Sequence, residues 1–110
     1  MPRVTVLNLR ETDDLAAIEL GLRAALTSLP EMRVEARDID LVPIRAPASF
    51  HAEVARIDVD LWEQSYRTKE ALQETALRMA QAFKDAVGHT RKVKVVLKPY
   101  DVAKSGWVTK

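Results

Sequence analysis

Apolar and polar residues alternate along the chain in a pattern that predicts two successive strand–helix–strand units. In the first unit, residues 3–9 and 36–44 are rich in aliphatic and β-branched residues and predict strands. Between them lies an apolar stripe at helical spacing, formed by Leu15, Ile18, Leu22, Ala25, Leu26 and Leu29. We expect Thr12 to cap this helix and Pro30 to end it.

The second unit repeats this order with a clearer pattern. Residues 54–62 alternate strictly, so that one face of the strand is apolar and the other carries polar residues and Trp62. A second helical stripe follows, formed by Leu72, Ala76, Met79, Ala80, Phe83 and Val87. We expect Thr68 to cap this helix and Gly88 to end it, before a fourth strand at residues 92–98.

The two units correspond to each other at an offset of 56 residues. Identical residues then meet in four pairs: Thr12 and Thr68, Ala24 and Ala80, Leu41 and Leu97, and Pro43 and Pro99. These pairs fall at a helix cap, a helix core position and a strand end, where a structural repeat would keep them.

A crossover between parallel strands is right-handed and places its helix on one face of the sheet. We therefore predict an α/β (α+β two-layer) fold, in which duplicated β-α-β units form a four-stranded mixed sheet with two helices on one face. Residues 1–110 are expected to form one domain, with halves at about residues 2–45 and 53–100 and a C-terminal tail at residues 101–110. Residues 45–52 are expected to be a loop.

The second face of this sheet is left without a helical cover. Its expected residues are Asp38, Asp40, Arg56, Asp58, Asp60, Lys92, Lys94 and Lys98, with Leu7, Trp62 and Val96. Paired carboxylates on one strand can bind Mg²⁺. Because Arg56 and the lysines lie within reach, we instead expect a charge-paired surface without a metal site. A mixed polar and apolar sheet face suits an oligomer interface.

Composition excludes several classes of function. Seventeen Lys and Arg residues against sixteen Asp and Glu give a net charge of +1, which argues against a dedicated nucleic-acid-binding protein. Without cysteine, and with only two isolated histidines, the chain lacks the usual metal ligands, and no cofactor is expected. Neither a membrane-spanning run nor a signal-peptide pattern is present, so we expect a cytoplasmic protein. Any chemistry must rest on arginine, carboxylates, tyrosine, lysine or the N-terminal amine.

Pro2 is the first candidate for catalysis. Methionine is generally removed before a small residue such as proline, which would leave a secondary amine at the start of a strand. An α-amino group titrates near ~7.7–8.0, and burial lowers this pKa, so such an amine can act as a neutral general base. If Met1 is retained, the Pro2 nitrogen is an amide and cannot do so.

Short motifs accompany this proline. Tyr66-Arg67-Thr68 opens the second helix and Arg10-Glu11-Thr12 precedes the first, while Val42-Pro43 ends a strand and Trp107 lies in the tail. With Pro2 and the doubled β-α-β unit, these segments resemble the tautomerase superfamily, which includes 4-oxalocrotonate tautomerase, malonate semialdehyde decarboxylase and macrophage migration inhibitory factor. The resemblance covers nearly the whole chain and implies a homotrimer that needs no cofactor.

The resemblance also implies roles for individual residues. Pro2 would be the catalytic base, and Arg67 would bind the substrate carboxylate, because a guanidinium binds carboxylates bidentately and stabilises a developing enolate. Arg10 is the matching arginine of the first half, and Arg37 lies where some members place a polar site residue. Trp107 would wall the pocket or cover a neighbouring subunit.

The chain also departs from the superfamily pattern. Gln64 and Ser65 stand where related decarboxylases and dehalogenases carry a second arginine, and Tyr66 replaces a glycine. An acidic residue that would activate water has no clear counterpart.

Three hypotheses follow. The leading one is a tautomerase-like enzyme that moves a proton between carbon and oxygen of a small, carboxylate-bearing enol or 2-oxo acid. The second is a non-catalytic oligomeric scaffold or binding module of the same fold. The third is a ferredoxin-like module that binds polyanions through residues 91–110, which hold six basic residues and one acidic residue.

Overall fold

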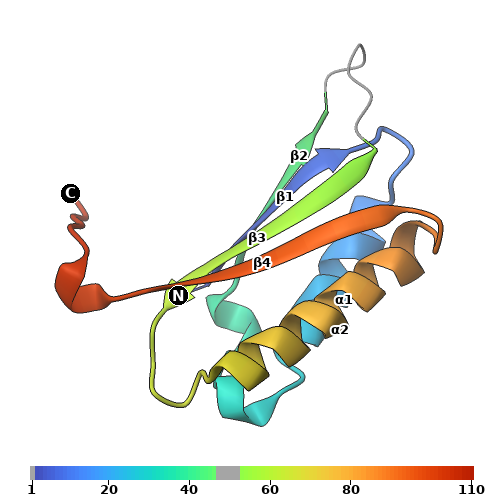
Figure 1. The fold of residues 1–110 in the computed structure, drawn as a ribbon. Helices are drawn as coiled ribbons and strands as arrows, with labels where there is room; N and C mark the ends of the chain where they lie inside the picture. Colours follow the sequence, from blue (N-terminus) through green and yellow to red (C-terminus); the bar gives the residue numbers. More distant parts are fainter. Residues whose placement is uncertain (1, 47–52) are drawn as a thin grey trace.

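The computed structural model describes residues 2–46 and 53–110, and Figure 1 shows its elements as two layers. The strands are β1 (Arg3–Leu9), β2 (Asp40–Arg45), β3 (Val54–Trp62) and β4 (Lys92–Tyr100), and the helices are α1 (Leu15–Leu26) and α2 (Lys69–Val87). Three short 3₁₀ helices are η1 (Pro30–Met32), η2 (Ala36–Asp38) and η3 (Val102–Lys104). Most of the loop expected at residues 45–52 lies outside the described residues.

The four strands form one mixed sheet in the order β2-β1-β3-β4. β1 pairs with β2 and β3 pairs with β4 in parallel, whereas β1 and β3 at the centre are antiparallel. Both helices cover the same face of the sheet, and the opposite face carries no helix (Figure 1). The predicted fold class is therefore confirmed.

The core lies between the sheet and the helices. The inward positions of β3 alternate as predicted, and Ala55, Ile57, Val59 and Leu61 are at most 2% exposed. They pack with Val4, Val6 and Leu9 of β1, Ile18, Leu22 and Leu26 of α1, and Met79 and Phe83 of α2. Each large side chain buried in this way contributes about 1.5–3 kcal/mol to folding.

The buried stripe of α2 matches the prediction at Met79 and Phe83, whereas Leu72, Ala76, Ala80 and Val87 are only partly buried. It follows Ala71, Thr75, Met79 and Phe83, so a threonine lies at the centre of the core face. Thr75 is fully buried because its hydroxyl donates a hydrogen bond to the Ala71 carbonyl, 2.8 Å away, which satisfies the polar group within the helix. The predicted cap is confirmed, since the Thr68 hydroxyl accepts from the Ala71 N–H at 3.1 Å.

The first helix begins and ends at different residues from those predicted. Its N-cap is Asp14, whose carboxylate accepts from the Ala17 N–H at 3.1 Å, and Thr12 lies outside the helix in an exposed turn. The helix starts later than predicted because Asp13, the residue before the cap, forms a buried ion pair with Arg91. The helix ends at Leu26, before Pro30, where the hydroxyls of Thr27 and Ser28 bond back to the last carbonyls of the helix.

The second strand begins four residues later than predicted. Residues 36–38 form η2, so Asp38 lies before the sheet and is not one of its residues. The strand begins at Asp40 because the Asp40 N–H donates to the Pro2 carbonyl at 3.0 Å. β4 continues to Tyr100 through Pro99, and β2 contains Pro43. Both prolines are tolerated because β2 and β4 are the edge strands.

No helix among the described residues is both long and apolar enough to cross a membrane.

Candidate active site

Pro2 lies at the end of the sheet where β3 ends and β2 begins. Its carbonyl accepts from Asp40 on one side, and the pairing of Arg3 with Asp60, extended by one position, sets Pro2 opposite Leu61. Pro2 is buried, on the same face of β1 as Val4 and hence toward the helices.

Arg67 belongs to the same end of the molecule. It lies in the connection between β3 and α2, and its Nε donates to the Met32 carbonyl at 3.0 Å. Its Nη1 donates to the Trp62 carbonyl at 2.7 Å. Arg67 therefore joins η1 to the end of β3 at Trp62. Trp62 is the residue that follows Leu61, which lies opposite Pro2. Arg67, which is expected to bind the substrate carboxylate, thus uses two of its N–H groups to hold backbone carbonyls.

An aromatic ring beside Arg67 also contacts a second arginine. The guanidinium carbon of Arg33 lies 4.3 Å from the centroid of the Tyr66 ring, and that of Arg67 lies 5.5 Å from it. Sequence reasoning did not select Arg33, because it lies in no motif and follows the short helix η1. The distinguishing feature of Arg33 is its φ of 52°, which the sequence does not reveal.

The other predicted site residues are Arg37, Arg10 and Trp107. Arg37 lies in η2, near the start of β2, but it is exposed and its Nε pairs with Glu35 at 2.8 Å. Arg10 follows the opposite end of β1, and the seven residues of that strand span about 23 Å at ~3.3 Å per residue. Within one chain, Arg10 and Pro2 therefore cannot contact the same small molecule.

Trp107 lies in the tail that follows β4 and is 68% exposed. The tail starts at the Pro2 end of the sheet, because Tyr100 pairs with Trp62 at the end of β3. From there it runs away from the helices (Figure 1). In the single chain, Trp107 is therefore largely open to solvent.

The carboxylates of the uncovered sheet face are engaged with nearby donors. Asp58 accepts from Arg56 at 2.8 Å and lies 3.7 Å from the Lys98 amine. Asp40 pairs with Arg3 at 3.1 Å, and Asp60 accepts from the Tyr100 hydroxyl at 3.3 Å. The described residues contain no group of three or more side chains that could hold a metal ion.

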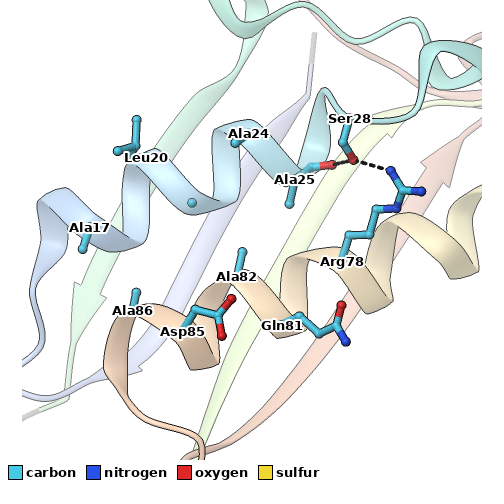
Figure 2. Close-up of a pocket in the computed structure, with 11 residues that line it drawn as sticks. Ala17, Leu20, Ala24, Ala25, Ser28, Arg78, Gln81, Ala82, Asp85 and Ala86 are labelled. Carbon is cyan, nitrogen blue, oxygen red and sulfur yellow. Dashed lines mark hydrogen bonds between the residues drawn. The ribbon is translucent and has the colours of Figure 1, made fainter.

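A shallow groove of about 620 Å³ runs between the two helices on their outer side. Figure 2 shows that small side chains line much of it and that Arg78 donates to the Ser28 hydroxyl, at 3.1 Å. Its remaining lining includes Leu20, Gln81 and Asp85. Arg78 also forms an ion pair with Glu74, so its positive charge is largely neutralised within α2. The groove is on the far side of the helices from the sheet, so it is separate from the Pro2 site.

No protein-family model and no curated protein matches the chain. Solved structures do match it in fold. A wild-type fused 4-OT, an asymmetric trimer, has a TM-score of 0.79 and 14% identity, over 96% of this chain and 91% of that chain. A malonate semialdehyde decarboxylase inhibited by 3-bromopropiolate has a TM-score of 0.70 and 16% identity, over 99% and 89%.

A member of the cis-3-chloroacrylic acid dehalogenase family has a TM-score of 0.74 and 14% identity, over 98% of this chain and 81% of that chain. These neighbours are enzymes of one superfamily with different reactions, so the fold alone does not select a reaction. The sheet order, the two helices on one face and the near-complete coverage show that this chain has the fold of the tautomerase superfamily.

Proposed function

We propose that the protein is a tautomerase-like enzyme in which the amine of Pro2, freed by removal of Met1, is the general base. The observation that carries this proposal is the position of Pro2, buried at the sheet end where Arg67 bonds to Trp62 and, with Arg33, contacts Tyr66; neither arginine has a carboxylate partner among the described residues. Burial disfavours the ammonium form of an amine, which leaves the lone pair available near neutral pH. The site supplies a base and a positive field without a cofactor.

The proposed reaction is a proton transfer in a small enol or 2-oxo acid. The Pro2 nitrogen takes the proton from the enol hydroxyl, and the carbon–oxygen double bond forms as electron density moves to the carbon. The resulting prolinium then delivers that proton to the carbon. Negative charge on the substrate during these steps is stabilised by the guanidinium groups of Arg67 and Arg33.

A homotrimer is part of this proposal. A fused 4-OT with the same fold forms a trimer, and the uncovered sheet face of this chain carries the half-buried apolar residues Leu7, Trp62 and Val96. Arg10 lies at the far end of β1 from Pro2 of its own chain, and Trp107 is exposed in the tail. We propose that subunit contacts bring one or both of them to Pro2 of a neighbour, where they would complete the pocket.

The first experiment is the intact mass of protein expressed without a tag. Protein that lacks Met1 is then screened with small enol and 2-oxo acids by following the loss of enol absorbance. Its matched control carries Gly-Ser before Pro2, which converts the amine into an amide. We expect the extension to lower the rate by about a hundredfold or more, the range of a lost general base. Equal rates for the two proteins would reject Pro2 as the base.

A non-catalytic binding module of the same fold is the second candidate. It is favoured by the use of Arg67 as a backbone tie to Met32 and Trp62, which withdraws part of its guanidinium from a substrate. Retention of Met1 in the intact mass would favour this candidate over the enzyme.

The polyanion-binding alternative has weaker support from the geometry. Within residues 91–110, Arg91 is buried against Asp13, and Lys98 and Lys104 lie near Asp58 and Asp101. Half of the six basic side chains in this segment are therefore close to a carboxylate.

A further inference from the structure

Two guanidinium groups share the ring of Tyr66 at the Pro2 end of the molecule. The ring is partly buried, with Arg33 4.3 Å and Arg67 5.5 Å from its centroid. Both distances are within the range of a cation–π contact, which is worth about 0.5–1 kcal/mol at exposed sites. The side chain of Tyr66 thus orients Arg33, which is otherwise exposed.

Most arginines of the described chain are neutralised by a carboxylate. Ion pairs are formed by Arg3, Arg23, Arg37, Arg56, Arg78 and Arg91. Within residues 2–46 and 53–110, neither Arg33 nor Arg67 has such a partner. Two like charges on one ring repel each other, and an anion between or beside them would remove this repulsion.

The two arginines differ in what they can offer to an anion. In Arg67, Nε and Nη1 each donate to a backbone carbonyl, so two of its three guanidinium nitrogens are already engaged and only Nη2 makes no hydrogen bond among the described residues. Arg33 makes no side-chain hydrogen bond among the described residues, so its whole fork remains available. The geometry therefore favours Arg33 over Arg67 as the residue that receives an oxyanion.

This cluster is connected to Pro2 through a short series of contacts. Arg67 donates to the Trp62 carbonyl, and Trp62 follows Leu61, which is opposite Pro2. Arg67 also donates to Met32, the residue before Arg33. We propose that Arg33, positioned by Tyr66 and backed by the charge of Arg67, binds the carboxylate of the ligand that occupies the Pro2 site. This inference rests on the proposed function for its ligand class and adds Arg33 as a specificity-determining residue.

The test uses succinate as the anionic probe and succinamide as its neutral counterpart of similar shape. Binding is followed by ¹H–¹⁵N NMR titration, which reports both the Kd and the residues that are perturbed. In the wild type, we expect succinate to shift the amide signals of residues 32–34 and 66–67, and succinamide to bind more weakly.

The main variant is Arg33→Gly. Glycine accepts the left-handed conformation of this position, with φ 52° and ψ 44°, so the fold should be retained while the guanidinium is removed. We expect succinate affinity to fall about tenfold, as for loss of a charged hydrogen-bonding group, and succinamide affinity to stay unchanged. Tyr66→Leu should weaken succinate binding, whereas Tyr66→Phe, which keeps the ring, should not. Arg78→Gln is the matched control because it also removes one positive charge.

The proposal is overturned if Arg33→Gly binds succinate as tightly as the wild type, or if the shifts gather around Arg10 and Arg45 instead. An equal loss in Arg78→Gln would show a general effect of charge and also reject it. The titration is repeated with Gly-Ser before Pro2. Succinate binding that survives this extension, together with equal turnover in the extended and unextended proteins, would reject the Pro2 base and keep the anion site, so the two proposals can fail separately.

Discussion

Arg91 and Asp13 form a buried ion pair that joins the two halves of the chain. The Arg91 Nη1 lies 2.8 Å and 3.1 Å from the two Asp13 carboxylate oxygens, and the side chains are 5% and 6% exposed. Arg91 Nη2 also donates to the Asn8 carbonyl at 3.1 Å, and the Arg10 N–H donates to Asp13 at 2.7 Å. The pair therefore fixes the turn after β1 against the turn before β4.

Replacing Arg91 should destabilise the fold strongly. Arg91→Met leaves the Asp13 carboxylate buried without its cation, and we expect a loss of about 3–5 kcal/mol in the free energy of unfolding. The control is Arg37→Met, which breaks the exposed pair with Glu35 and should cost within about 1 kcal/mol. Urea unfolding followed by circular dichroism measures both. Similar losses for the two variants would contradict the structural importance of the buried pair.

Arg67 should contribute to stability as well as to the charge of the site. Arg67→Lys keeps the positive charge but cannot hold the Met32 and Trp62 carbonyls together, because lysine has one donor group on a flexible stem. We expect a loss of about 1–3 kcal/mol, the cost of leaving partly buried carbonyls unpaired. Thermal unfolding tests this. An unchanged stability would mean that the two hydrogen bonds are easily replaced by water.

Gly88 should resist substitution for a purely conformational reason. It follows α2 with φ 119° and ψ 141°, and a Cβ added there meets no atom within 4 Å. Gly88→Ala should therefore lose about 1–3 kcal/mol from backbone strain alone. A Cβ on Gly106 also meets no atom within 4 Å, and its φ is not positive, so Gly106→Ala should change stability by less than about 0.5 kcal/mol. Because neither site is crowded, denaturant unfolding of the two variants isolates the cost of the positive φ at Gly88.

The cap of α1 can be tested at Asp14 and Thr12. Asp14→Ala removes the acceptor for the Ala17 N–H and should cost about 1 kcal/mol. Thr12→Ala should have almost no effect, because Thr12 is exposed and outside the helix. If Thr12→Ala proved the more costly change, the helix would begin where the 56-residue correspondence places it, and not at Leu15.

The proposed trimer predicts that a charge introduced on the uncovered sheet face weakens assembly. Val96 is half-buried beside Asp58 on this face, and Val96→Lys would place a cation where a neighbour is proposed to pack. We expect sedimentation velocity to show smaller species for this variant. Leu77→Lys is the control, since Leu77 lies on α2 and is 52% exposed. A wild type that sediments as a monomer would reject the trimer outright.

Local signals were sufficient wherever one element decides its own structure. The alternation of residues 54–62 predicted the strand and its buried face, and the hydroxyl of Thr68 predicted the start of α2. These signals succeed because periodic burial and capping depend on residues within a few positions of each other. The order of the elements then restricted the fold to two layers with both helices on one face.

Contacts between distant residues decided what the local pattern could not. Asp14 caps α1 because its neighbour Asp13 is held by Arg91, 78 residues away in the sequence. The second strand starts at Asp40 because its N–H pairs with Pro2. Arg33 and Tyr66 meet only because η1 and the turn before α2 pack together through Arg67. Sequence by itself determined the elements and the residue types available for chemistry. Tertiary structure decided which polar groups meet, because hydrogen bonds and ion pairs depend on positions in space that no local periodicity encodes.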